Sequence, residues 1–265
     1  MARKAVYPKV AADMFIVQMS WTFWFLGILL AVQIIKMVIG GFQENGTDPY
    51  FNSVFIAANV YMLIIGIISI YFLPYYVENG VTRKDYFKGT FLALCGLSVA
   101  IPVIAICIST LENLILGNIV QFRDMDIVNS VAAKIDINSN IIGEVISGVV
   151  QSVILPPYIS PESSWILAIA VFSLNIFMYY LLGWMISASF YRYNVITGLL
   201  FIGFSIIILI VRDGLLRTSL NLPVPSRYYI FESLPASILL LGVAILIVIA
   251  AVVIRQFTKD VAIKM

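Results

Sequence analysis

The 265-residue chain contains no histidine, and this absence removes several classes of catalytic and metal-binding site at once. A Ser-His or Cys-His nucleophile system and a histidine metal site are excluded. No glycine is followed by lysine, so the chain also lacks the phosphate-binding loop of P-loop ATPases. We therefore predict no catalytic residue, no metal site and no cofactor bound by this chain.

Charged residues are scarce, at 11% of the chain, whereas 62% of the residues are hydrophobic. One soluble core of this size cannot bury so much apolar material, so the composition indicates an integral membrane protein. The net charge is only +2, which provides no broad basic field for nucleic acid. We expect a single transmembrane domain over residues 1–265 and no nucleic-acid partner.

Six apolar stretches are long enough for a helix to cross the hydrocarbon core, which predicts an all-α fold with six transmembrane helices. They cover residues 19–39, 52–76, 90–111, 165–190, 194–211 and 234–254.

Threading the spans alternately places most of the basic residues on one side of the membrane. These are Arg3, Lys4, Lys9, Arg83, Lys84, Lys88, Arg192, Arg255, Lys259 and Lys264. Basic residues gather on the cytoplasmic side of membrane proteins, so both termini are predicted to be cytoplasmic. Arg212, Arg217 and Arg227 are placed outside by this topology.

The N-terminal segment, residues 1–18, has apolar residues at helical spacing. Val6, Val10, Met14 and Val17 form the stripe. This pattern predicts an amphipathic elbow helix in the membrane interface before the first span. The alternative is that these residues are simply the start of the first span.

The segment "ENGVTRKDYFKGT", residues 78–90, is polar and partly basic although it lies between two long apolar runs. Thr82 and Asp85 have the spacing of a capping box, and Gly80 permits a sharp turn before them. We expect a short cytoplasmic helix that offers Tyr86 and Phe87 to another protein. The alternative is a solvated loop in which the capping residues occur by chance.

The stretch "NGVTRKDYFKGT" resembles a segment that follows the second span in the permease subunits of type-2 ABC transporters, which are bacterial exporters with six spans. In that family the segment is the coupling helix, which docks into a groove of a cytoplasmic ATPase. The resemblance implies this role for Asn79, Gly80, Val81, Thr82, Arg83, Lys84, Asp85, Tyr86 and Phe87.

The resemblance also implies partners and a location. The partners are cytoplasmic ABC ATPase subunits, which bind ATP and Mg, a second permease copy or paralogue, and membrane lipids. The location is the bacterial plasma membrane. A further stretch, "GWMISASFYRYNVITG", is similar to the family's connection between the fourth and fifth spans, where Gly183, Ser187 and Ser189 would let helices approach closely.

The outer connections are expected to carry amphipathic helices. In the long loop 112–164, the stripe from Ile141 to Val153 predicts a helix that stops at Pro156. It either packs on the tops of the spans, or forms a lid or a contact with a second permease. The last outer loop, after residue 211, is expected to contain short interfacial helices.

The central parts of the predicted spans are almost free of charge, which weighs against a proton- or sodium-coupled carrier. Asn59 and Asn175 are the deep polar residues, and they either hydrogen-bond between helices or line a pathway. The expected function is ATP-driven export of an amphipathic or lipophilic cargo, such as an antimicrobial peptide, a drug or a lipid. A membrane scaffold for a cytoplasmic partner and an uncoupled channel are the alternatives.

Overall fold

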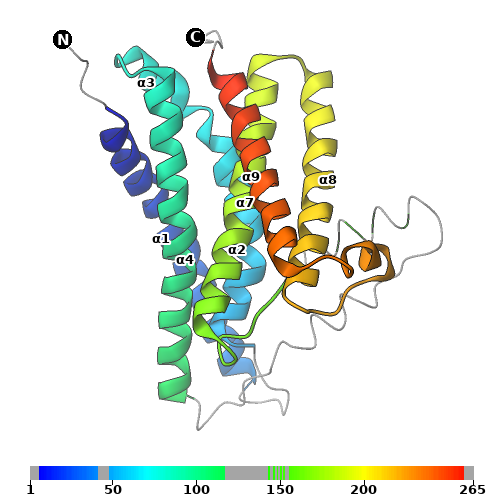
Figure 1. Cartoon of the computed structure of the whole chain (residues 1–265). Coiled ribbons are helices and arrows are strands. Elements are labelled where there is room, and N and C mark those ends of the chain that lie inside the picture. Colours follow the sequence, from blue (N-terminus) through cyan, green and yellow to red (C-terminus); the bar gives the residue numbers. More distant parts are fainter. Residues whose placement is uncertain are drawn as a thin grey trace.

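The computed structural model describes residues 6–40, 48–116 and 155–259, together with residues 143, 146, 148, 150 and 152. Most of the described residues are helical, and no strand occurs among them. With the labels of Figure 1, the elements are α1 (Tyr7–Gly40), α2 (Tyr50–Ser69), α3 (Phe72–Glu78), α4 (Arg83–Leu116), α7 (Trp165–Arg192), α8 (Val195–Ser219), the 3₁₀ helix η1 (Ser226–Phe231) and α9 (Ala236–Lys259).

Among the described residues, six helices are long and apolar enough to cross a membrane, with α2 and α3 counted together as one. The prediction of an all-α fold with six candidate spans is therefore confirmed. The helices form one bundle in which α1 begins and α9 ends at the same end (Figure 1). We call this the basic end, because it carries Lys9, Arg83, Lys84, Lys88, Arg192, Arg255 and Lys259.

Helices α2 and α7 make the most extensive helix–helix contact in the bundle. A Cβ atom on Gly66 of α2 would lie 2.2 Å from the Tyr180 carbonyl oxygen, and one on Gly183 of α7 would lie 2.1 Å from the Leu63 carbonyl oxygen. Only glycine leaves room for backbones this close. The predicted close approach at Gly183 is confirmed, and its partner surface is the backbone of α2 at Leu63 and Ile67.

Helix α1 is a single helix of 34 residues, and a separate elbow helix over 1–18 is not confirmed. The buried residues Val10, Met14, Gln18, Thr22 and Leu26 repeat every four positions across the expected junction. Because this stripe is continuous, α1 packs on the bundle without a break from Val10 to Leu26. Val10 lies against Gly89 of α4.

The second span is divided into α2 and α3 by a turn at Ile70 and Tyr71. Pro74 lacks an N–H group, so it cannot donate the helical hydrogen bond to the Ile70 carbonyl. The Leu73 N–H donates to that carbonyl instead, at 3.1 Å, as in a tighter 3₁₀ turn. The chain therefore changes direction before it reaches residues 78–90.

The fifth span differs from the expectation at its C-terminal end. Helix α8 continues to Ser219, eight residues beyond the expected end at 211, since Asp213 and Arg217 pair along the helix. The last connection contains η1, a short helix with exposed Tyr229 and Ile230. The helix expected over 141–153 lies mostly outside the described residues.

The α2–α7 contact predicts that Gly183→Ala lowers stability by about 1–3 kcal/mol, because the new methyl group overlaps the Leu63 carbonyl. Gly203→Ala in α8 is the matched control, since nothing lies within 4 Å of its Cβ position. Alanine favours helix over glycine by up to about 1 kcal/mol, so the control is expected to be neutral or stabilising. Thermal unfolding in mild detergent measures both, and equal melting temperatures would contradict the packing argument.

Candidate functional site

The turn between α3 and α4 at the basic end is built as its sequence predicts. Gly80 has a φ of 79°, a left-handed conformation that glycine adopts without strain. The Asp85 N–H donates to Thr82 Oγ1 at 3.0 Å, and the Thr82 hydroxyl donates to Asp85 Oδ2 at 2.9 Å. The predicted cap is confirmed, and it begins the long helix α4. A separate short helix over 78–90 is not confirmed.

Tyr86 does not face outward, so the prediction that it is offered to another protein is wrong. Tyr86 is completely buried, and its hydroxyl donates to the Ser69 carbonyl at 2.5 Å. Phe87 is partly buried and stacks on Trp184 of α7, with ring centroids 5.5 Å apart. The two rings anchor the start of α4 to the core, because Tyr86 bonds to α2 and Phe87 packs on α7.

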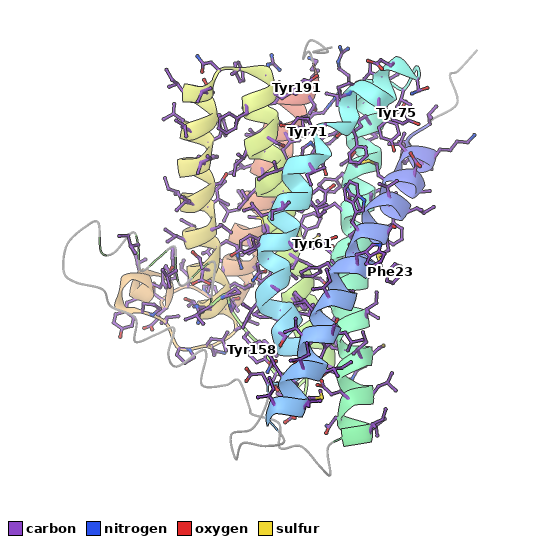
Figure 2. All side chains as sticks on the ribbon, turned by 180° about the vertical axis from the view of Figure 1, so that it is seen from behind. Phe23, Tyr61, Tyr71, Tyr75, Tyr158 and Tyr191 are labelled. Carbon is purple, nitrogen blue, oxygen red and sulfur yellow. The ribbon has the colours of Figure 1, made fainter. Side chains whose placement is uncertain are left out.

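The exposed groups near the turn come from α3 and the turn itself. Asn79, Gly80 and Lys84 are exposed, whereas Val81, Thr82, Arg83 and Asp85 are partly buried. Tyr71 and Tyr75 are 68% and 59% exposed, and Figure 2 shows both near the basic end. Glu78 and Lys88 are exposed in the same segment as well. We call Tyr71, Tyr75, Asn79, Gly80 and Lys84 the turn surface.

A buried group of hydrogen-bonded side chains connects the turn to four helices. We call this group the polar core, and it consists of Gln18, Ser69, Tyr86 and Tyr180. Gln18 Nε2 donates to the Tyr180 hydroxyl at 2.9 Å and to Ser69 Oγ at 3.1 Å. Tyr86 reaches the same helix end through the Ser69 carbonyl. All four are buried, so the start of α4 is linked to α1, α2 and α7.

The two deep asparagines lie in different surroundings. Asn59 is completely buried in α2, and neither of its side-chain polar atoms has a hydrogen-bond partner in the described part of the chain. Asn175 of α7 donates to the Pro157 carbonyl at 3.3 Å and accepts from Arg212 Nη1. Asn175 therefore bonds to α8 and to the segment before α7, as expected of a residue that links helices.

A buried cluster of charge was missed by sequence reasoning. Arg212, Asp213 and Arg217 of α8 are completely buried, and Arg217 Nε donates to Asp213 Oδ2 at 3.0 Å. The guanidinium of Arg212 lies over the ring of Tyr179, 5.6 Å from its centroid. We call Asn175, Tyr179, Arg212, Asp213 and Arg217 the charge cluster.

The sequence does contain a signal for this cluster. An acid four residues before an arginine, as in Asp213 and Arg217, is a stabilising pair on a helix. That spacing favours continuation of the fifth span past 211, whereas charge density alone suggests a loop. The side-chain burial of the pair follows only from the packing of α8 on α7 and could not be found from local spacing.

At the end opposite the basic end, Glu112 of α4 holds three helices together. Its Oε1 accepts from Gln33 Nε2 of α1 at 2.7 Å, and its Oε2 accepts from the Tyr50 N–H of α2 at 2.8 Å. A carboxylate is favourable at a helix N-terminus, where backbone N–H groups are free. A cavity of about 180 Å³ lies nearby, and it is lined by Leu29, Val32, Lys36, Asp48, Asn52, Ser53 and Ile56.

The described residues contain no group of three or more histidine, cysteine, aspartate or glutamate side chains that could hold a metal ion. Comparison with protein families, with curated proteins and with solved structures finds no match for this chain. The features of the molecule that bear on its function are therefore the turn, the polar core and the charge cluster.

The polar core predicts that Tyr86→Phe lowers stability by about 1–2 kcal/mol, because the Ser69 carbonyl loses a buried donor. Tyr75→Phe, at an exposed tyrosine of the same end, is the matched control and should have almost no effect. Thermal unfolding in detergent compares the two. Equal stability of both variants would show that the Tyr86 hydroxyl contributes nothing.

The Glu112 contacts predict that Glu112→Gln costs about 1.5–3 kcal/mol, since charge-assisted hydrogen bonds to Gln33 and Tyr50 are weakened. The introduced NH₂ group would also oppose the donor of either Gln33 or the Tyr50 backbone. Glu162→Gln, at an exposed acid, is the control. If limited proteolysis and thermal unfolding do not distinguish the variants, the three-helix link is unimportant for stability.

Proposed function

We propose that this chain is the transmembrane subunit of an ATP-driven ABC exporter, acting with separate cytoplasmic ATPase subunits and a second permease. The observation that carries the proposal is the capped turn at the basic end, which is exposed on one side and bonded to the polar core on the other. A partner that displaces such a turn also displaces α1, α2 and α7, because the buried hydrogen bonds connect them.

The division of roles within residues 79–87 follows from burial. Asn79, Gly80 and Lys84 form the contact with the ATPase, together with Tyr75 of α3 and Tyr71 directly before α3. Thr82 and Asp85 keep the turn rigid, and Tyr86 and Phe87 transmit its movement into the bundle. Arg255 Nη1 of α9 donates to the Arg83 carbonyl at 3.4 Å, so α9 is also bonded to the start of α4.

In this mechanism the chemistry belongs to the partner. ATP binding closes the ATPase pair, the turn is pushed, and the helices rearrange to open a path for the cargo. ATPase and cargo then bias the same conformational equilibrium, so each changes the apparent affinity for the other. The basic end faces the cytoplasm of a bacterial plasma membrane, and the cargo is amphipathic or lipophilic because the helices offer aliphatic, aromatic and hydroxyl groups.

The proposal predicts that Arg83→Glu combined with Lys84→Glu leaves membrane insertion intact and abolishes stimulation of the partner ATPase. Two cations at the turn become two anions, which reverses the charge presented to the partner. The measurement is a mild-detergent pull-down from native membranes, followed by an ATP hydrolysis assay of the bound proteins. Lys9→Glu combined with Lys259→Glu is the matched control, since both lysines are exposed at the basic end but belong to α1 and α9.

Recovery of an ATPase that is lost only in the double variant at the turn would support the exporter. Recovery of a cytoplasmic partner without ATPase activity would instead favour a membrane scaffold. Recovery of the folded protein alone would favour an uncoupled channel, which conductance in planar bilayers would test.

A further inference from the structure

Arg212 holds an unused pair of hydrogen-bond donors in the interior of the bundle. Its Nη1 donates to Asn175 Oδ1, whereas Nε and Nη2 have no hydrogen-bond partner in the described part of the chain, although the residue is completely buried. Nε–H and one Nη2–H point in parallel from the same edge of the guanidinium group. That edge is the fork that binds a carboxylate or a phosphate through two hydrogen bonds.

Among the described residues around Arg212, cationic side chains outnumber anionic ones. Asp213 pairs with Arg217, and this is the only ion pair among the residues that the structure describes. The charge cluster thus contains two guanidinium groups and one carboxylate. A buried cation without an anionic partner is costly, and the ring of Tyr179 compensates for it only in part.

The cluster lies well inside the bundle. Asn175 is 10 residues and Tyr179 is 14 residues beyond Trp165, the first residue of α7, which corresponds to roughly 15 and 21 Å along the helix. An anionic ligand that reached Arg212 would therefore be held within the membrane-spanning part. A water-exposed surface arginine, in contrast, would not require its ligand to enter the membrane-spanning part.

Residues 155–158, which we call the strap, run beside α7 and cover this region. The Pro157 carbonyl accepts from Asn175, the Leu155 carbonyl accepts from Arg217, and the Tyr158 hydroxyl donates to Asn52 of α2 at 2.6 Å. Pro156 and Pro157 have no N–H groups, so the strap offers mainly acceptors to the donors of the cluster. Tyr158 lies in the half of the bundle away from the basic end (Figure 2).

We propose that Arg212 binds the anionic group of an amphipathic molecule, a carboxylate or a phosphate, through its Nε and Nη2 atoms when the strap moves aside. As a statement about exported cargo, this inference rests on the proposed function. Binding of the anion itself does not, because it requires no ATPase. The strap closes the site in the state that the structure shows, and its carbonyls release the cluster's donors when it leaves.

The first experiment measures ligand stabilisation of the full chain, purified in dodecyl maltoside, by thermal unfolding. The probes are dodecyl phosphate and dodecanoate, with uncharged dodecanol as the isosteric control and inorganic phosphate as the probe without an alkyl chain. We expect both anionic amphipaths, but not dodecanol, to raise the melting temperature in a saturable way. Stabilisation by inorganic phosphate as well would show that the anion alone is sufficient.

Variants assign the binding to Arg212. Arg212→Gln should weaken the apparent affinity for dodecyl phosphate by roughly tenfold or more, because two charge-assisted hydrogen bonds are lost. Arg212→Lys keeps the charge but lacks the fork, so an intermediate loss is expected. Arg192→Gln, at the basic end of α7, is the control and should bind as the wild type does.

The strap provides a second test that does not depend on the folding of an Arg212 variant. Tyr158→Phe removes the bond to Asn52 but keeps the ring packed on Phe51 and Phe55. A larger open population should then increase the apparent affinity by roughly fivefold, whereas Tyr75→Phe should not.

Two results would overturn the proposal. One is equal stabilisation of the wild type by dodecanol and dodecyl phosphate, and the other is undiminished dodecyl phosphate binding in a folded Arg212→Gln variant. Neither result depends on recovery of an ATPase. Failure of the anion site and failure of the exporter proposal can therefore be told apart.

Discussion

The direct backbone contact of α2 with α7 is the constraint on which the rest of the bundle depends. Gly66 and Gly183 bring the two helices so close that carbonyl oxygens of each occupy the space of a missing side chain on the other. At one end of this pair, Ser69 and Tyr180 form the polar core with residues of α1 and α4. At the other end, Phe51 and Phe55 of α2 pack on Phe172 of α7 and on Tyr158. A change in the spacing of α2 and α7 would therefore alter both ends together.

Much of the fold follows from sequence because membrane helices are determined by local properties. Length and apolarity are sufficient to predict six spans, and the capped turn at Gly80, Thr82 and Asp85 follows from residue spacing alone. Whether a given residue faces the core or the surface does not follow from these local properties. Tyr86 looks like an exposed residue of a polar segment, yet the turn at Ile70 places it against Ser69 and Trp184. Similarly, Val10 has the pattern of an interfacial helix, but Gly89 offers it a packing site on α4.

Charges within the spans were the least predictable part of the candidate site. A span predicted from hydropathy ends where charged residues begin, because an isolated charge in hydrocarbon is costly. Arg212, Asp213 and Arg217 escape this rule, since they face α7 and the strap instead of lipid. Their burial depends on contacts between segments separated by 37 and 62 residues in the chain, which no local pattern encodes.

The helices are held together unequally, and this inequality indicates which of them can move. Helices α1, α2, α4 and α7 share the polar core and one continuous apolar core. Helices α8 and α9 do not contribute to the polar core, but Ile208 and Leu209 of α8 and Ala250, Ile254 and Phe257 of α9 belong to the same apolar core. A second, smaller apolar cluster contains Leu215, Leu239 and Val243. Between α7 and α8 the described polar link is the Arg212–Asn175 bond, so separating the two helices would break few hydrogen bonds. The same separation would uncover the unpaired donors of Arg212. Movement of α8 away from α7 would thus expose the cation at the moment when space for a ligand appears.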